Sequence, residues 1–244
     1  TYLREFPVDT TAARYAFGIV QTRELVGVWD ETTEDLIRLS IALEQKGNNP
    51  CGAAYAQLWL TRFALFQSDP QETLTRAERG LEMAEACGET KHIAHAYSFI
   101  GAAQIEQAAY RKALENLIES ERLYLTTDDQ MGLAMVKLDL AVAYMELDAR
   151  PKSQQLSWEA AKIYQEQGEE LRYAVAIIDL CNDYLATDQL DSVDIYLPQA
   201  EDIVRDQHPL ALAYVYQHYG QLNLKRENYG EAVKSLEKSL EINE

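Results

Sequence analysis

Residues 211–243 read ALAYVYQHYGQLNLKRENYGEAVKSLEKSLEIN and combine two segments of helical apolar spacing with a short polar break between them. The same two-part pattern recurs along the chain at an interval of about forty residues. Each of six copies places a small side chain three residues before a large aliphatic one: Ser40/Leu43, Gly80/Met83, Ser120/Leu123, Ala160/Ile163, Ala200/Ile203 and Ser239/Ile242. A second column of large apolar residues runs about twenty residues earlier: Val20, Leu60, Ile100, Leu140, Leu180 and Tyr219. Repetition of two-element units predicts a solenoid, because no unit can bury its own apolar face alone.

We therefore predict an all-α fold, a right-handed α-solenoid of about six antiparallel helix pairs that forms one domain over residues 1–244. The predicted repeats are 10–47, 51–87, 90–127, 129–167, 169–206 and 209–243. The predicted helices are 10–27, 32–46, 51–67, 70–87, 90–108, 110–126, 129–147, 151–167, 169–187, 190–206, 209–226 and 229–243. The breaks between them are short and rich in Gly, Pro, Asp and Asn. Pro198 lies inside one predicted helix, where we expect a kink or break because proline removes a backbone hydrogen bond.

The charge balance narrows the class of partner. The chain has 40 acidic and 22 basic residues and a formal net charge of −18, which repels phosphate backbones, so we expect no nucleic-acid partner. No apolar run approaches the ~20 residues of a membrane helix, and we expect no direct membrane insertion of this segment. The opening TYLREFPVDTTAARY has neither an initiator Met nor the basic start and apolar core of a signal peptide. We expect an excised or processed piece of a longer chain.

Three cysteines, Cys51, Cys87 and Cys181, make an odd count without CxxC spacing, so neither a zinc site nor a disulfide framework is indicated. Cys181 is expected to be an ordinary buried thiol. Cys51 should open one helix and Cys87 should close its antiparallel partner, which brings both to the same end of one hairpin. A disulfide and two free thiols both remain open there, and free thiols are the default in cytosolic chains.

The last repeat carries Tyr216, Tyr219-Gly220, Tyr229, Glu231-Ala232, Leu236 and Ser239 in a characteristic order. The third repeat, AHAYSFIGAAQIEQAAYRKALENLIES at 94–120, carries Tyr97, Ile100-Gly101, Tyr110, Ala113, Leu117 and Ser120. The fourth and fifth repeats align more weakly, through Leu140-Ala141, Tyr144, Ser153 and Ala160, then Leu180-Cys181, Tyr184, Val193 and Ala200. In residue pattern these repeats resemble the tetratricopeptide repeat (TPR) family more than HEAT or armadillo repeats.

The first two repeats depart most from that family. There Gln21 and Thr61 replace the glycine, and the aromatic residues shift to Tyr15, Phe17, Trp59 and Phe63. The interval also exceeds the family norm of about 34 residues. Long-repeat TPR arrays of this kind resemble those found beside effector domains in bacterial signalling proteins such as diguanylate cyclases, histidine kinases and large transcription activators. The resemblance implies a bacterial cytoplasmic or periplasmic protein, and the residues do not decide between these compartments.

No catalytic or cofactor motif is recognisable. The four histidines, His92, His95, His208 and His218, are scattered without nucleophile or base partners, so we expect no enzyme in this segment. His92 and His95 lie one turn apart, but two metal ligands without a third are a weak signal, and we interpret them as packed or solvated. No metal or other cofactor is predicted. Acidic pairs such as Asp128-Asp129 are interpreted as helix caps rather than calcium loops.

The resemblance implies a concave groove lined by the first helix of each pair. The groove residues it predicts are Tyr55, Leu58, Arg62, His95, Ser98, Ala102, Met135, Leu138, Val142, Val175, Ile178, Asn182, Tyr214, Gln217 and Gln221. Chaperone-type TPR domains hold a C-terminal carboxylate with Lys, Asn and Arg, whereas only Arg62 and Asn182 are such donors here, so we reject a carboxylate clamp. An apolar middle flanked by polar and aromatic residues suits an amphipathic helix or hydrophobic peptide. The alternative is that a tight superhelix buries these residues against each other.

The leading hypothesis is a non-enzymatic TPR module that binds protein or peptide, as the sensory or regulatory segment of a larger bacterial signalling protein, with a diguanylate cyclase as first choice. The alternatives are a stand-alone adaptor and the TPR segment of a transcription activator or histidine kinase. The last helix presents Val233, Leu236 and Leu240 as an apolar stripe without a polar outer face. We expect a further repeat, a signalling helix or a second copy of the chain to cover it.

Overall fold

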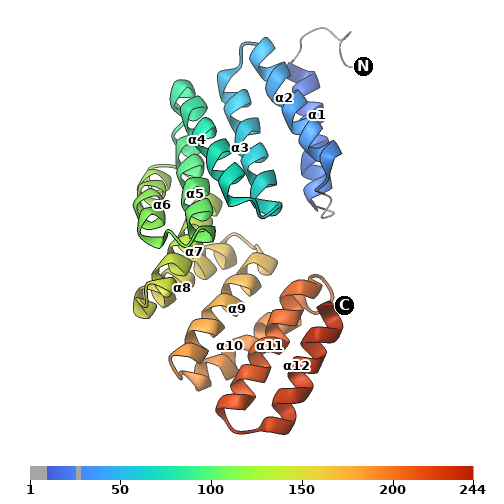
Figure 1. The fold of residues 1–244 in the computed structure, drawn as a ribbon, viewed down its shortest axis with the longest axis vertical. Helices are drawn as coiled ribbons and strands as arrows, with labels where there is room; N and C mark the ends of the chain where they lie inside the picture. The colour runs from blue at the N-terminus through green and yellow to red at the C-terminus, as the bar shows by residue number, and fades with distance from the viewer. Residues whose placement is uncertain (1–9, 26–28, 244) are drawn as a thin grey trace. The chain divides into compact units, whose positions relative to one another are not determined.

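The computed structural model describes residues 10–25 and 29–243. Over these residues the chain forms twelve helices and no strand, which confirms the all-α fold (Figure 1). The helices are α1 (Thr10–Leu25), α2 (Glu31–Lys46), α3 (Pro50–Phe66), α4 (Pro70–Cys87), α5 (Thr90–Glu106), α6 (Tyr110–Tyr124), α7 (Gln130–Glu146), α8 (Arg150–Glu166), α9 (Glu170–Ala186), α10 (Leu190–Val204), α11 (Pro209–Lys225) and α12 (Tyr229–Asn243). The predicted helix ends agree within two residues, and residues 26–27 of the first prediction lie outside the described residues.

Contacts between Cα atoms divide the chain into an N-terminal unit, Thr1–Gly132, and a C-terminal unit, Leu133–Glu244. In the N-terminal unit each helix from α1 to α6 packs against the next, and α3 also contacts α5. In the C-terminal unit the helices from α8 to α12 pack in the same sequential way, and α9 also contacts α11. Contact between the first helices of neighbouring pairs is what a stack of repeats requires. The single domain over residues 1–244 stays a prediction.

Turn geometry repeats more regularly than turn sequence. Residues with left-handed backbone recur about every twenty residues, with none near positions 128 and 208 of the described chain: Asn48, Ser68, Gly88, Ala108, Asp148, Gly168, Asp188 and Glu227, with φ between 54° and 78°. Left-handed residues just past a helix end bond the last free carbonyls and stop the helix. Asp69 Oδ1 then accepts from Glu72 N at 3.0 Å, and Pro70 occupies the first turn of α4. The connections that contain these left-handed residues therefore close over two or three residues.

The two helices of a pair cross where both carry small side chains. The first helices contribute a column of alanines with at most 2% exposure: Ala13, Ala54, Ala94, Ala134, Ala174 and Ala213. The predicted small column on the second helices is also buried, and its serines bond this alanine column. Ser120 Oγ donates to Ala94 O at 2.7 Å, and Ser239 Oγ donates to Ala213 O at 2.8 Å. Close backbone approach thus also satisfies the buried hydroxyls.

The column of large apolar residues on the first helices forms much of the core. Val20, Leu60, Ile100, Leu140 and Leu180 are at most 6% exposed. The large member of each small/large pair, such as Leu123 or Ile163, is only partly buried. Of the kink or break expected at Pro198, the break does not occur, because helix α10 continues through this residue.

Glycines of the TPR motif let a leucine of the second helix approach the first helix. A β-carbon on Gly101 would lie 2.5 Å from Leu117 Cδ2, and one on Gly220 would lie 2.6 Å from Leu236 Cδ2. These pairs are the motif positions that the sequence aligned in the third and last repeats. The glycine of the motif is therefore needed because a larger residue would clash with the leucine of the second helix.

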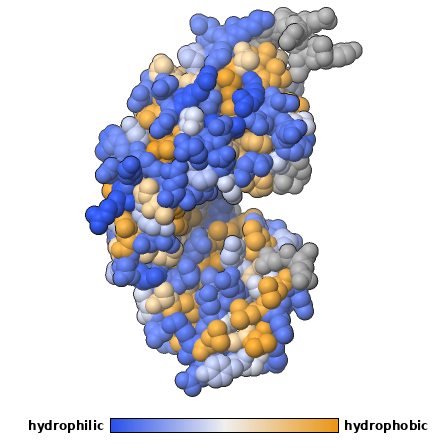
Figure 2. Space-filling view, viewed as in Figure 1, coloured by the Kyte–Doolittle hydropathy of each residue, from blue (hydrophilic) through white to orange (hydrophobic). Residues whose placement is uncertain are grey.

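On the face in view, Figure 2 shows apolar surface gathered over α11 and α12. Val233 and Leu240 of the predicted apolar stripe are exposed, whereas Leu236 is half-buried over Gly220. The stripe is thus two exposed side chains with a packed leucine between them.

Gly220→Ala should lower the free energy of unfolding by about 1–3 kcal/mol, because the new methyl group forces Leu236 out of its position. Gly230→Ala is the matched control: nothing lies within 4 Å of its added β-carbon, and alanine should raise helix stability by up to about 1 kcal/mol. Urea denaturation followed by circular dichroism measures both. Equal effects at the two glycines would contradict this account of the motif.

Lowering the pH from 7 to 5 should destabilise the fold through His218. This residue is 6% exposed, its Nδ1 has no partner among the described residues, and burial lowers its pKa from 6.5 to about 4, against a smaller raising effect of bonds to Ile178 and Gln221. Its folded pKa is the lower one, so the unfolded chain is protonated first and stability falls as the pH drops below about 6.5. The loss at pH 5 should be about 2 kcal/mol.

Urea denaturation at both pH values, on the wild type and on His218→Gln, measures this loss. The free energy of unfolding of the wild type minus that of His218→Gln should fall by about 2 kcal/mol between pH 7 and pH 5, because glutamine does not titrate. A difference that stays constant would show that His218 titrates normally in the folded chain.

Candidate functional site

Two predicted groove residues meet in a cavity of the N-terminal unit. Tyr55 on α3 and His95 on α5 line it together with His92, and its volume is about 530 Å³. The rest of the lining is Asn49, Cys51, Gly52, Glu89, Lys91 and Asp129. We call this cavity the histidine pocket. It is lined largely from the N-terminal ends of α3, α5 and α7.

The caps at these three helix starts differ. Asn49 Oδ1 accepts from Gly52 N at 3.1 Å, and Asp129 Oδ1 accepts from Gly132 N at 2.8 Å, so both side chains are engaged by their own helices. Glu89 occupies the same position before α5 but makes no cap bond. Its carboxylate therefore remains available at the rim of the pocket.

Aromatic stacking holds the inner wall. Tyr55 stacks on His92 with ring centroids 5.3 Å apart, and Phe17 packs on the Tyr55 ring at 5.2 Å, so a row of rings crosses α1, α3 and α5. His95 stacks on Phe99 at 4.5 Å. These contacts fix the imidazole planes but use none of the ring nitrogens.

Both imidazoles keep unused hydrogen-bonding capacity. His92 Nδ1 and His95 Nε2 are buried and have no partner in the described part of the chain. Burial, with a contribution from Lys91, lowers the pKa of His92; burial and Arg62 lower that of His95 to about 4, although Asp129 acts in the opposite direction. Both rings are thus neutral near pH 7, and a neutral imidazole donates a hydrogen bond from one nitrogen and accepts one at the other.

Cys51 and Cys87 form a disulfide beside this pocket, with their Cα atoms 5.1 Å apart. It ties the first turn of α3 to the last residue of α4, the hairpin end at which the sequence placed both cysteines. Cys181 is a buried free thiol, and burial raises its pKa to about 12. The disulfide thus decides an alternative that the sequence left open.

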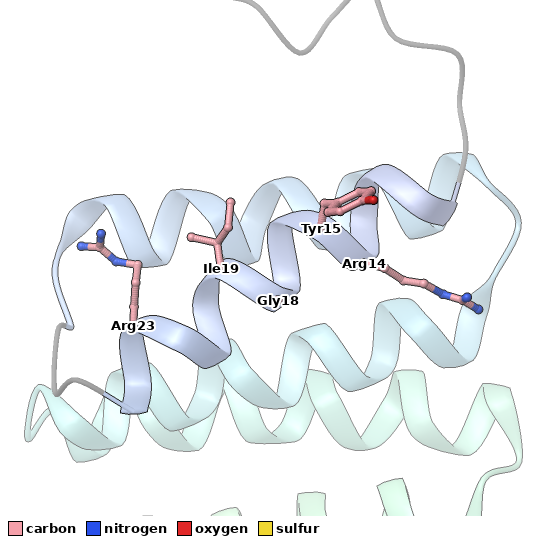
Figure 3. Close-up of a pocket in the computed structure, with 5 residues that line it drawn as sticks. All are labelled: Arg14, Tyr15, Gly18, Ile19 and Arg23. Carbon is pink, nitrogen blue, oxygen red and sulfur yellow. The ribbon is translucent and has the colours of Figure 1, made fainter.

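A second apolar surface lies on α1 and was missed from the sequence. Tyr15 and Ile19 project side by side from this helix, with Arg14 and Arg23 toward its two ends (Figure 3). They line a cavity of about 300 Å³ with Gly18, and Tyr15 is 74% exposed and Ile19 50%. The four-residue spacing of Tyr15 and Ile19 on one helix face was the available signal. The first repeat departs from the TPR motif, so the alignment did not point to them.

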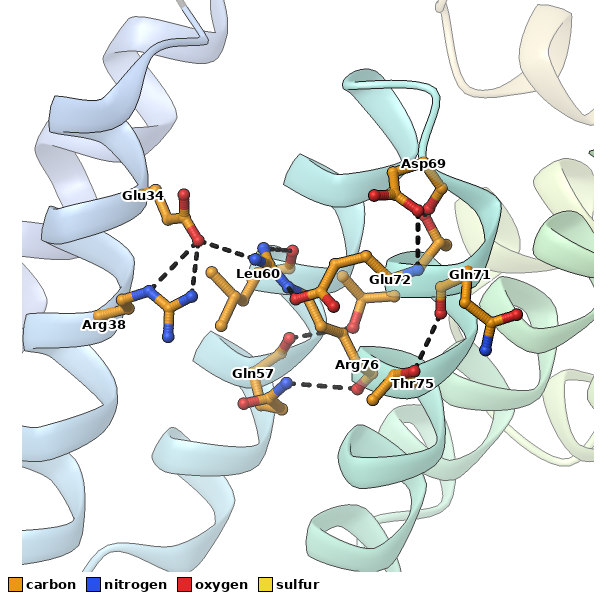
Figure 4. Close-up of polar contacts among 11 residues, drawn as sticks. Glu34, Arg38, Gln57, Leu60, Asp69, Gln71, Glu72, Thr75 and Arg76 are labelled. Atoms are coloured by element: carbon orange, nitrogen blue, oxygen red, sulfur yellow. Dashed lines mark hydrogen bonds and ion pairs between the residues drawn. The ribbon is translucent and has the colours of Figure 1, made fainter.

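Another cavity of the N-terminal unit is acidic and has a structural explanation. It measures about 470 Å³ and is lined by Asp30, Glu31, Glu34, Phe63, Ala64, Gln67, Asp69, Glu72 and Arg76. Figure 4 shows Arg76 between α2, α3 and α4: it donates to Glu34 Oε1 at 2.8 Å, to Leu60 O at 3.1 Å and to Glu72 Oε1 at 2.6 Å. Burial raises the pKa of Glu34. The guanidinium groups of Arg38 and Arg76 outweigh this effect and hold the pKa of Glu34 below its usual range. The cluster therefore joins three helices.

In the C-terminal unit, Asn182 and Gln221 line a cavity of about 310 Å³ with Leu185, Ala186, Leu224 and Lys225. The predicted residues of α7, namely Met135, Leu138 and Val142, are half-buried, as is Val175 of α9. Tyr214 and Gln217 of α11 are exposed. In the N-terminal unit Arg62 and Ala102 are also half-buried.

Leu58, Ser98 and Ile178 correct the predicted groove. They occupy equivalent positions in three repeats, and none is more than 4% exposed. Leu58 packs with Ala96 and Phe99 of α5, which shows that this column faces the first helix of the next pair. At these three positions the alternative applies, in which neighbouring repeats bury the side chains against each other.

The described part of the chain contains no helix that is both long and apolar enough to cross a membrane. No protein-family model matches the chain, and no curated protein matches its sequence.

Solved structures share the fold at low identity. Aspartyl phosphate phosphatase F from Bacillus subtilis aligns with a TM-score of 0.72 and 12% identity over 96% of this chain and 60% of its own. A Rap protein complexed with competence and sporulation factor aligns with a TM-score of 0.71 and 10% identity, over 95% of this chain and 72% of its own. A signal transduction ATPase with a tetratricopeptide repeat sensor from Pyrococcus horikoshii aligns with a TM-score of 0.68 and 15% identity, over 94% of this chain and 36% of its own. The architecture and its repeat motif agree: this chain has a TPR-like α-solenoid fold.

Proposed function

We propose that this chain is a non-enzymatic TPR module that binds a protein or peptide along the first helices of its pairs. The observation that carries the proposal is the arrangement of half-exposed apolar and aromatic side chains beside cavities on these helices. In the N-terminal unit they are Tyr15 and Ile19 on α1 and Tyr55 at the histidine pocket. Exposed apolar patches of this kind are typical of interaction sites.

The chemistry of the C-terminal unit favours an apolar peptide or an amphipathic helix. Met135, Leu138 and Val142 lie at positions i, i+3 and i+7 of α7, so they form one stripe along the helix. Such a stripe receives the apolar face of a partner helix. The chain's net charge of −18 favours a partner that carries basic residues around that face, because opposite charges speed encounter.

The similar solved structures support a role in interaction. One is a Rap protein in complex with competence and sporulation factor, and another carries a tetratricopeptide repeat sensor. Their identities of 10% and 15% show a shared fold, and the role is extended to this chain by analogy.

For the parent protein we propose a bacterial signalling protein, with a diguanylate cyclase as first choice because long TPR repeats of about forty residues resemble those of such proteins. A histidine kinase or transcription activator fits the same resemblance. A stand-alone adaptor is the second candidate, favoured by the exposed Val233 and Leu240 of α12, which would serve self-association. The intact mass and terminal peptides of the native protein in its source cell distinguish a larger signalling chain from an adaptor.

Leu138→Glu should weaken partner binding at least about tenfold, because it places a charge in the apolar stripe of α7. Gln165→Glu is the matched control: it adds the same charge at an exposed position of α8. Ile178 is unsuitable for this test, since it is buried and glutamate there would disturb folding. The partner is identified by affinity capture with the wild-type chain, and its Kd is then measured by fluorescence anisotropy.

Circular dichroism must show equal helicity in both variants. Unchanged binding by a folded Leu138→Glu chain would rule out this surface as the binding site.

A further inference from the structure

We propose that Cys51, Cys87 and Glu89 form a redox-gated site for a thiophilic divalent cation of the zinc type, closed in the disulfide form and opened when that bond is reduced. In the described part of the chain, the two sulfur atoms and a carboxylate oxygen of Glu89 all lie within 4.8 Å of one another. Zn²⁺ binds thiolates and carboxylates in tetrahedral sites. The structure thus gathers three ligands of the right kind.

The backbone brings these ligands together without help from the metal. Cys51 lies in the first turn of α3, Cys87 ends α4, and Glu89 stands at the start of α5. Gly88 between the last two has a left-handed backbone with φ 78°, which turns the chain so that Glu89 returns toward Cys87. An L-residue with a side chain at position 88 would be strained in this conformation.

Glu89 differs from the other residues that precede first helices in this unit. Asn49 and Asp129 bond the backbone of their own helices, whereas Glu89 makes no such bond. The backbone of α5 therefore does not use the Glu89 carboxylate. The sequence analysis placed Cys51 and Cys87 at one hairpin end, 36 residues apart, but did not indicate Glu89 as a third ligand.

Opening the site requires a dithiol or phosphine reductant. With a dithiol, two electrons and two protons pass to the Cys51–Cys87 bond, the S–S bond breaks into two thiols, and the reductant becomes a disulfide. Zn²⁺ then binds both sulfurs as thiolates and releases two protons to solvent. Glu89 supplies the third ligand and water the fourth, which leaves a site at the rim of the histidine pocket.

The full chain carrying Cys181→Ala tests the proposal with Co²⁺ as a spectroscopic stand-in for Zn²⁺. After reduction with a phosphine and its removal under anaerobic conditions, the chain should bind one Co²⁺ with a sulfur-to-cobalt charge-transfer band, and Zn²⁺ should displace it. The oxidised chain should show no such band. A reduced chain without the band overturns the proposal.

Variants separate the site from general thiol binding. Glu89→Gln should raise the Kd for Co²⁺ about tenfold or more, whereas Glu85→Gln, an exposed residue of α4, should leave it unchanged. Cys51→Ser should abolish the band. A Glu89→Gln chain with wild-type affinity, or a band that persists in Cys51→Ser, overturns the site. If reduction unfolds the chain, refolding on addition of Zn²⁺ supports the proposal and failure to refold overturns it.

Discussion

The close crossing of the two helices in each pair is the constraint on which the rest of the structure depends. At the crossing an alanine of the first helix meets a small residue of the second, as at Ala94 and Ser120, and the serine hydroxyl bonds the alanine carbonyl. Backbones held this close leave no space for larger side chains, which must pack on either side of the crossing. The large residues of the core, such as Ile100 and Leu117, lie at those flanking positions. One contact, repeated at forty-residue intervals, therefore sets the helix spacing along each unit.

Much of this was predictable from sequence, because the helix-forming information is local. Helical apolar spacing and short polar breaks placed the helix ends within the described residues to within two residues. The alanine column was missed, since alanine is common in any helix and its role appears only when its partner helix is present. The left-handed turn residues were also largely invisible: Ser68, Ala108 and Glu227 have little preference for that backbone. There the packing of the pair fixes the turn and overrides residue preference.

The candidate site was less predictable because it depends on contacts between repeats. Tyr55 and His95, two predicted groove residues, line one cavity, whereas Leu58 is buried because α5 packs beside α3. A helical wheel shows on which face of a helix a side chain lies, but it does not show which neighbouring helix covers that face. The shared hairpin end of Cys51 and Cys87 was predictable, whereas the approach of Glu89 depends on the left-handed turn at Gly88 and was not. Packing against the next repeat thus determines which of the predicted groove residues are exposed.

The two open nitrogens of the histidine pocket argue that its lining is not explained by stability alone. A buried polar atom without a partner costs about 1–3 kcal/mol, and this pocket contains two, at His92 Nδ1 and His95 Nε2. Phenylalanine at these positions would keep the ring contacts with Tyr55 and Phe99 and avoid that cost. Packing therefore accounts for the rings but not for the imidazoles. A hydrogen-bonding group in the pocket, water included, would offset the cost, and Glu89, Asp129 and Cys51 line the same pocket. The two imidazoles are therefore the lining residues of this pocket that packing within the N-terminal unit does not explain.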